Sequence, residues 1–229
     1  MEDPNRPFLQ TQPHEAVFST FIQRVYQWMA MGLALTALVA FLTASNATLL
    51  RFLFSGGMWL FFLVELGIVI WLTSSVQRIS PQAAVLGFLT YATINGITMA
   101  GIVLYYTAAS ISSTFFITAV TFGGVSVYGW VTKQDLTSVG SFCGMVLWGV
   151  IIASIVNIFF HAPAFYWILS YVGVAVFIGL TAYDTQKLKA IHQSTADAPE
   201  QLAIFGALML YLDFINMFLF LLRIFGRRR

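Results

Sequence analysis

Three acidic side chains of this 229-residue chain lie inside apolar stretches: Glu65, Asp184 and Asp213. A charged side chain at the centre of a bilayer costs at least roughly 2.5–3.5 kcal/mol. No lysine or arginine lies in the middle of these stretches to neutralise the acids. The three acids must therefore be protonated, share a proton, bind a cation, or pair with a basic residue that reaches in from a helix end.

Asp184 and Asp213 lie in two consecutive apolar stretches near the end of the chain. Asp184 is near the end of its stretch, and the next stretch re-enters from the same side, so the two carboxylates can approach each other. Helical spacing places Asp213 within a polar stripe on an otherwise apolar helix. The stripe contains Gly206, Met209, Asp213, Asn216 and Met217.

Structural roles compete with chemical ones at each acid. Each carboxyl group is neutral in the simplest interpretation, and bonds to a threonine, a tyrosine or a backbone carbonyl. For Glu65 the sequence leaves two interpretations open, a proton-carrying group and a protonated tie between helices. Arg78 follows the stretch that contains Glu65 and can serve as a latch on a carboxylate. An arginine at such a helix end ordinarily snorkels to the lipid headgroups instead.

Composition indicates the elements that must position these acids. Hydrophobic residues make up 59% of the chain and charged residues only 9%, whereas a soluble domain has roughly 25% charged residues. A spanning helix needs roughly 20 apolar residues, and such stretches recur along nearly the whole length. The sequence predicts an all-α bundle of seven transmembrane helices, at about 25–44, 57–76, 83–105, 111–131, 139–160, 164–186 and 203–224.

This bundle is expected to be a single membrane domain, residues 25–226. It follows a polar N-terminal segment, residues 1–24, which lacks the apolar core of a cleavable signal peptide. It precedes a short basic tail, residues 227–229. The longest internal loop, about 187–202, is the expected mobile surface segment.

Lysine and arginine counts predict the orientation. The opposite internal loops have only Arg51, whereas the N-terminal side carries Arg6, Arg24, Arg78, Lys133, Lys187 and Lys189. The N-terminus is therefore expected in the cytoplasm and the C-terminus outside it. In an alternative with six spans, the last apolar segment is re-entrant.

Other classes of function lack the residues they need. The single cysteine, Cys143, allows no intrachain disulfide and no cysteine–histidine zinc site. The small net charge of +2 makes nucleic acid an unexpected partner. The seventh stretch has no lysine for a retinal. We expect no metal centre from the scattered histidines and no cofactor; the histidines are His14, His161 and His192.

Two segments resemble the signature stretches of the Bax inhibitor-1 family: residues 182–189, around Asp184, and 210–216, around Asp213. Each places an acid in an apolar context, which is an unusual pattern. Further similarity lies at Glu65, at 132–136 and at 221–226, so the resemblance covers about residues 18–226. The chain is most similar to bacterial members of the YbhL type.

The resemblance implies a seven-helix fold with the last helix central, in the inner (plasma) membrane. It also implies a pH-sensitive calcium leak controlled by an aspartate pair, which corresponds to Asp184 and Asp213. The acid of the second helix corresponds to Glu65. Relatives with an arginine latch carry it in a basic run, whereas residues 76–78 contain one arginine, Arg78.

Three functions follow as hypotheses. In a cation leak channel, the aspartates share a proton at low pH, and its loss separates them and opens a path; carboxylate oxygens suit calcium. An intramembrane aspartyl protease also needs two such acids, and Tyr183 and Asp184 match its Tyr-Asp pair. However, Asp213 lacks the protease's Gly-x-Gly and Pro-Ala-Leu context, so we expect no enzyme. A non-conducting regulator would instead bind another membrane protein, such as a membrane protease.

Overall fold

The computed structural model describes residues 13–76, 78–160, 163–194 and 200–229. The described chain is helical, without a strand, and seven of its helical segments are long and apolar enough to cross a membrane. The predicted all-α, seven-helix membrane fold is confirmed. The helices are α1 (Pro13–Ala44), α2 (Ala47–Phe52), α3 (Met58–Ser75), α4 (Pro81–Tyr105), α5 (Ala108–Val131), α6 (Thr137–Phe160), α7 (Pro163–Ser194) and α8 (Glu200–Phe225).

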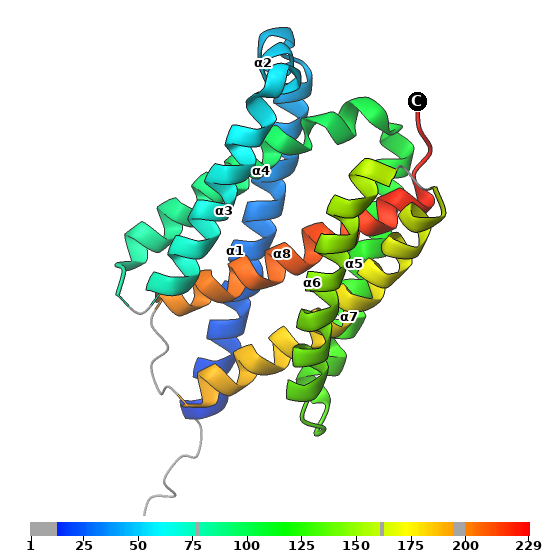
Figure 1. Cartoon of the computed structure of the whole chain (residues 1–229). Coiled ribbons are helices and arrows are strands. Elements are labelled where there is room, and N and C mark those ends of the chain that lie inside the picture. The colour runs from blue at the N-terminus through cyan, green and yellow to red at the C-terminus, as the bar shows by residue number, and fades with distance from the viewer. Residues whose placement is uncertain (1–12, 77, 161–162, 195–199) are drawn as a thin grey trace, which may run out of the picture.

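The second span is interrupted near its start. A π-helical turn, Leu53–Gly57, joins α2 to α3, and Gly56 within it has a φ of 113°. Only glycine adopts this backbone conformation without strain. The chain therefore bends here, and α2 projects at one end of the molecule beside the end of α1 (Figure 1).

Helix starts follow local capping rules. Ser80 precedes α4 and its side chain accepts a hydrogen bond from the Ala83 N–H, while Pro81 occupies the first helical position. Thr107 caps α5 in the same way by accepting from the Ser110 N–H. These side chains satisfy backbone N–H groups that have no partner inside the helix.

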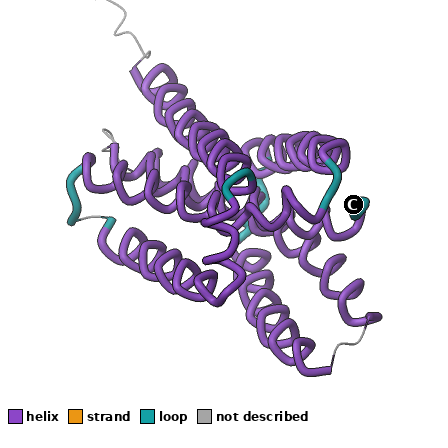
Figure 2. Tube along the Cα trace, turned by 90° about the horizontal axis from the view of Figure 1, so that it is seen from above, coloured by secondary structure: helices purple, strands orange, loops and turns teal. Residues whose placement is uncertain are grey.

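The last helix is the core of the bundle. α8 contacts α1, α4, α5 and α7, and it runs through the middle of the molecule in Figure 1; Figure 2 shows the helices of the bundle from above. Most of its side chains are buried, among them Tyr211, Asp213 and Met217. The last helix is thus central, as the resemblance implied.

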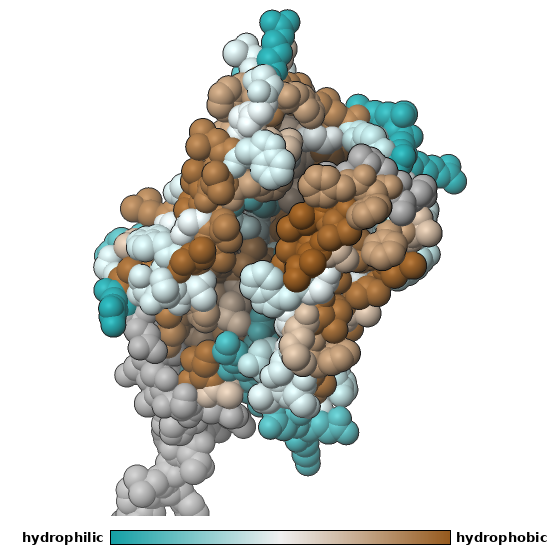
Figure 3. All heavy atoms as spheres, viewed as in Figure 1, coloured by the Kyte–Doolittle hydropathy of each residue, from teal (hydrophilic) through white to brown (hydrophobic). Residues whose placement is uncertain are grey.

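The outer surface is apolar. Large side chains such as Trp59, Phe159 and Phe160 are mostly exposed, and soluble proteins rarely expose apolar surface on this scale. Hydrophobic residues cover the middle of the visible face, and hydrophilic residues gather toward its two ends (Figure 3). This distribution fits a surface that faces lipid tails.

Some predicted boundaries are wrong. α1 begins at Pro13 instead of about residue 25, and most of the predicted 187–202 loop is helical, because α7 continues to Ser194 and α8 begins at Glu200. Hydropathy marks where a helix leaves the bilayer, whereas a polar but helix-compatible sequence continues the helix into water. Residues 195–199 lie outside the described part of the chain. α8 is one continuous helix of 26 residues, which argues against the re-entrant alternative.

Candidate functional site

The central helix buries an acid. Asp213 on α8 is 4% exposed, and its Oδ2 atom accepts no hydrogen bond from the described residues. A buried polar atom of this kind is rare in folded proteins, because its lost hydration is normally replaced by a hydrogen bond. The burial of Asp213 therefore lowers the free energy of unfolding.

The structure brings Asp184 to Asp213. Asp184 lies on α7, is half-buried, and interacts electrostatically with the Asp213 carboxylate. Lys187 lies almost one turn further along α7 and interacts with Asp184 from the exposed side. The pair therefore has one carboxylate inside the bundle and one nearer its surface.

Tight packing fixes the part of α7 that carries Asp184. A Cβ atom on Gly129 of α5 would lie 2.4 Å from the Ala182 carbonyl oxygen. A Cβ atom on Gly140 of α6 would lie 2.4 Å from the Tyr183 ring. A neighbouring backbone or ring approaches a helix this closely only where a small residue occupies the contact. The two glycines thus let α5 and α6 pack closely against residues 182 and 183, just before Asp184.

Hydrogen bonds also hold the polar C-terminal end of α7. Gln186 accepts a hydrogen bond from the Leu136 N–H (2.8 Å) and donates one to the Gln134 carbonyl (2.8 Å). Lys189 Nζ donates to the Trp130 carbonyl at 2.7 Å. The two segments of family resemblance at 132–136 and 182–189 therefore bind each other directly.

Asp135 has a local role in that loop. Its Oδ1 accepts a hydrogen bond from the Thr137 N–H at 2.9 Å, at the start of α6. Hydrogen bonds from Thr137 lower the pKa of this exposed carboxyl group. Asp135 is therefore an ordinary ionised capping residue, unlike the acids inside the bundle.

Buried hydroxyl groups form a stripe along α5, which contacts α7 and α8. The hydroxyl stripe consists of Ser110, Thr114, Thr118 and Ser126, all buried and spaced by multiples of four residues. Thr118 bonds back to the Thr114 carbonyl, and Thr185 of α7 donates to Ser126 at 3.5 Å. Thr114 Oγ1 has no hydrogen-bond partner among the described residues. Sequence reasoning missed this stripe, although its four-residue period was visible.

Glu65 belongs to a different cluster. This buried acid of α3 accepts a hydrogen bond from Thr98 at 2.9 Å, and Asn95 also bonds to it, both from α4. Asn95 Oδ1 in turn accepts from the Tyr211 hydroxyl of α8 at 3.0 Å. The Tyr211 hydroxyl lies 2.6 Å from Thr36 Oγ1, which donates to the Ala92 carbonyl at 2.8 Å.

This Glu65 network ties four helices together: α1, α3, α4 and α8. It reaches α8 two residues before Asp213, but the groups that interact electrostatically with Asp213 do not include Glu65. The structure therefore brings two of the three acids together and places the third apart.

Arg78 is exposed in the turn between α3 and α4. Within the described residues, no ion pair joins it to Asp184, Asp213 or Glu65. The same part of the chain contains no group of three histidine, cysteine or acidic side chains that could hold a metal ion.

Known proteins resemble this chain over nearly its whole length. The family model described as Bax1-I, inhibitor of apoptosis-promoting Bax1, matches residues 18–229. The inner membrane protein YbhL of Escherichia coli K12 is 45% identical over 220 residues, 93% of this chain and 94% of that protein. An uncharacterized protein of Deinococcus radiodurans is 43% identical over 211 residues, 91% of each chain. Another from Borreliella burgdorferi is 42% identical over 214 residues, 91% of this chain and 92% of its own.

Proposed function

This chain belongs to the Bax inhibitor family of membrane proteins, and we propose that it is a pH-sensitive cation leak channel that conducts calcium. Asp184 and Asp213 form its gate. The proposed location is the inner membrane, with the N-terminus in the cytoplasm, because a 45% identical relative is named an inner membrane protein and basic loops favour the cytoplasmic side.

The observation that supports this proposal is the approach of Asp184 to a buried Asp213 whose Oδ2 has no hydrogen-bond partner among the described residues. Two adjacent carboxylates in a poorly hydrated site cannot both be ionised at low cost. At low pH the pair shares a proton and holds α7 against α8. When that proton leaves, repulsion between the carboxylates favours separation of the two helices.

The hydroxyl stripe supports a path along the same helices. Its side chains follow the face of α5 that is buried in the bundle, from Ser126 beside Thr185 to Ser110 at the opposite end of the helix. Calcium prefers oxygen ligands, and hydroxyl and carboxylate oxygens are the polar groups present here. A cation that passes the open gate would therefore continue along the hydroxyl stripe.

In the proposed mechanism, Glu65 acts on the gate through α8. Its network includes Tyr211, which is on the same helix as Asp213. A change in the protonation of Glu65 would alter this network and bias the position of α8. Arg78 is not used in this mechanism.

Calcium flux into proteoliposomes that contain only the purified protein tests the proposal. Wild-type flux should rise with pH, and Asp213→Asn or Asp184→Asn should flatten that dependence, because asparagine keeps the shape and removes the titrating charge. Asp135→Asn is the matched control, since it changes an exposed acid that only caps α6. It should retain the wild-type profile.

Two other outcomes would decide between the remaining functions. Flux no greater than in empty liposomes would favour the non-conducting regulator that binds another membrane protein. Cleavage of a helical membrane substrate that Asp213→Ala abolishes would favour the protease. We expect no such cleavage, because Asp213 follows Tyr211 and Leu212 instead of a glycine-rich stretch.

A further inference from the structure

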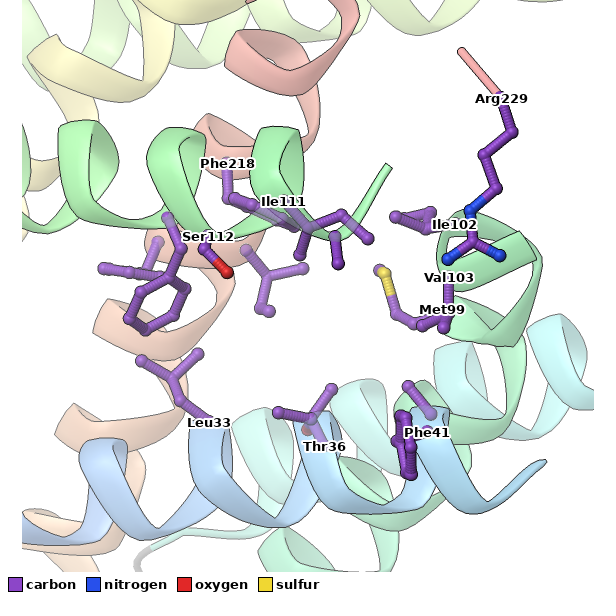
Figure 4. A pocket seen from close by; sticks show the side chains of 16 residues that line it. Leu33, Thr36, Phe41, Met99, Ile102, Val103, Ile111, Ser112, Phe218 and Arg229 are labelled. Carbon is purple, nitrogen blue, oxygen red and sulfur yellow. The ribbon is translucent and has the colours of Figure 1, made fainter. Parts of the chain in front are cut away.

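An apolar cavity of about 290 Å³ lies between α1, α4, α5 and α8. Figure 4 shows Leu33 and Thr36 of α1 on one side of it and Ile111 of α5 and Phe218 of α8 on the other. Its volume is near the lower end of the roughly 300–1,000 Å³ of small-molecule sites. The cavity is separate from Asp184 and Asp213, neither of which lines it.

A cationic side chain lies at this cavity. Arg229 is one of the lining residues, and its guanidinium group extends toward Val103 and Met99 in Figure 4. The lining is otherwise almost entirely apolar. Its two hydroxyl groups are on Thr36, which already bonds to Ala92 and Tyr211, and on Ser112.

The fold holds Arg229 in this position. The Arg229 N–H donates to the Tyr105 carbonyl at 3.0 Å, and the Thr107 N–H donates to the Arg227 carbonyl at 3.1 Å. The Arg227 N–H also donates to Ser110 Oγ at 3.0 Å. The last three residues are therefore bound to the connection between α4 and α5, and the Arg228 guanidinium lies 5.1 Å from the Tyr105 ring centroid.

The charge at this end is not balanced within the described residues. Neither Arg227 nor Arg229 forms an ion pair with a described acidic side chain, and both are exposed. Arginine binds phosphate through several parallel hydrogen bonds, and basic pockets between transmembrane helices bind anionic headgroups. The mainly apolar lining of the cavity beside these arginines suits an apolar occupant.

We propose that this cavity binds an acyl chain of an anionic phospholipid, with the lipid phosphate on Arg229. Two residues that line the cavity, Phe41 and Phe115, are 63% and 44% exposed on the outer surface of the bundle. An acyl chain can thus enter from the bilayer without crossing a polar barrier. The bound lipid belongs to the leaflet at the C-terminal end of α8 and contacts the central helix through Phe218.

Native mass spectrometry of the full chain tests this site, with phosphatidylglycerol and phosphatidylcholine of identical acyl chains as probes. Phosphatidylglycerol should bind more tightly to the wild type. Arg229→Gln should weaken phosphatidylglycerol binding about fivefold, the effect of one arginine near a headgroup, and leave phosphatidylcholine binding unchanged. Arg51→Gln is the control, because Arg51 is an exposed arginine on α2 at the same end of the molecule (Figure 1).

A second pair of variants tests the cavity itself. Ala37→Trp would fill it from α1, and should weaken the binding of both lipids. Leu38→Trp, next to it on the same helix, is outside the cavity and should bind both lipids as the wild type does. The proposal is wrong if Arg229→Gln and Arg51→Gln bind phosphatidylglycerol with equal affinity. It is also wrong if Ala37→Trp and Leu38→Trp bind the two lipids equally well. These measurements do not depend on ion flux.

Discussion

At the scale of single residues, the chain uses its buried acids in two different ways. The Glu65 carboxylate is supplied with donors by Thr98 and Asn95. Asp213 Oδ2 has no hydrogen-bond donor among the described residues and interacts instead with a second carboxylate. A satisfied polar network rigidifies a core, whereas an unsatisfied acid is a candidate for function. Glu65 thus resembles a structural tie more closely than Asp213 does.

The Glu65 network predicts the effect of removing one hydroxyl group. Tyr211→Phe removes the hydroxyl group that forms hydrogen bonds with both Asn95 and Thr36. It should destabilise the protein by about 1–3 kcal/mol, since buried partners are left unpaired. Thermal unfolding in detergent would show a lower midpoint.

Tyr91→Phe is the matched control for that substitution. Tyr91 is also buried on α4, and its ring meets the Tyr211 ring edge to face, but its hydroxyl bonds to no described residue. Loss of the Tyr91 hydroxyl group should leave the free energy of unfolding nearly unchanged. Equal destabilisation by both variants would show that the network contributes nothing beyond ring packing.

The aspartate pair predicts non-additive substitutions. If Asp184 and Asp213 hold one shared proton, either asparagine variant already abolishes the shared titration. The double variant should then change the pH profile of calcium flux little beyond either single one. Effects that sum across the two substitutions would mean that the carboxylates act independently.

At the scale of elements, the proposed gating requires that α7 be held by some neighbours and be able to move relative to another. Gly129 and Gly140 bring α5 and α6 against Ala182 and Tyr183, the two residues before Asp184, and Gln186 and Lys189 anchor the polar end of α7 to the α5–α6 connection. These contacts attach the segment to α5, to α6 and to the connection between them. In the proposed mechanism, separation of Asp184 from Asp213 occurs at the α7–α8 contact.

The close contact at Gly129 predicts a difference between two glycines of one helix. Gly129→Ala places a Cβ atom against the Ala182 backbone, which cannot move aside as a side chain would. The substitution should lower the free energy of unfolding by about 1–3 kcal/mol, as overpacking does. Gly124→Ala meets no atom within 4 Å and should be neutral or stabilise the helix slightly. Unfolding midpoints of the two variants check this, and similar values would contradict the packing argument.

At the scale of the whole molecule, one helix connects every candidate site. α8 carries Tyr211 of the Glu65 network, Asp213 of the proposed gate and Phe218 of the cavity. Its neighbours α1, α4, α5 and α7 each contribute to at least one of these sites. A displacement of α8 would therefore alter all three sites, and it would link the proposed lipid binding to the proposed gate.

Seven spans predict which side of the membrane each end occupies. A cysteine at Ser194, at the end of α7, and a cysteine added after Arg229 should be labelled from opposite sides of the membrane, with Ser194 on the cytoplasmic side. Membrane-impermeant thiol reagents on intact and lysed cells measure this, after Cys143 is replaced by serine. Labelling of both positions from one side would contradict the topology.

The sequence by itself determined the membrane class, the seven helices and the three acids inside them. These properties are local: hydropathy depends on the free energy of transferring each segment into lipid, and an acid stands out in any apolar stretch. The ends of α1 and α7 were misjudged because transfer free energy measures the bilayer boundary, and helix formation continues past it.

Only the tertiary structure decided which residues meet. The Tyr211 hydroxyl contacts Thr36, which is 175 positions away in the sequence. Asp213 lies near Asp184 and apart from Glu65. Arg229 and Leu33 line the same cavity, although they are far apart in the sequence. Each contact depends on the rotation and crossing of helices around α8. Those are set by side-chain packing between distant segments, such as Gly129 against Ala182, and no single segment contains that information.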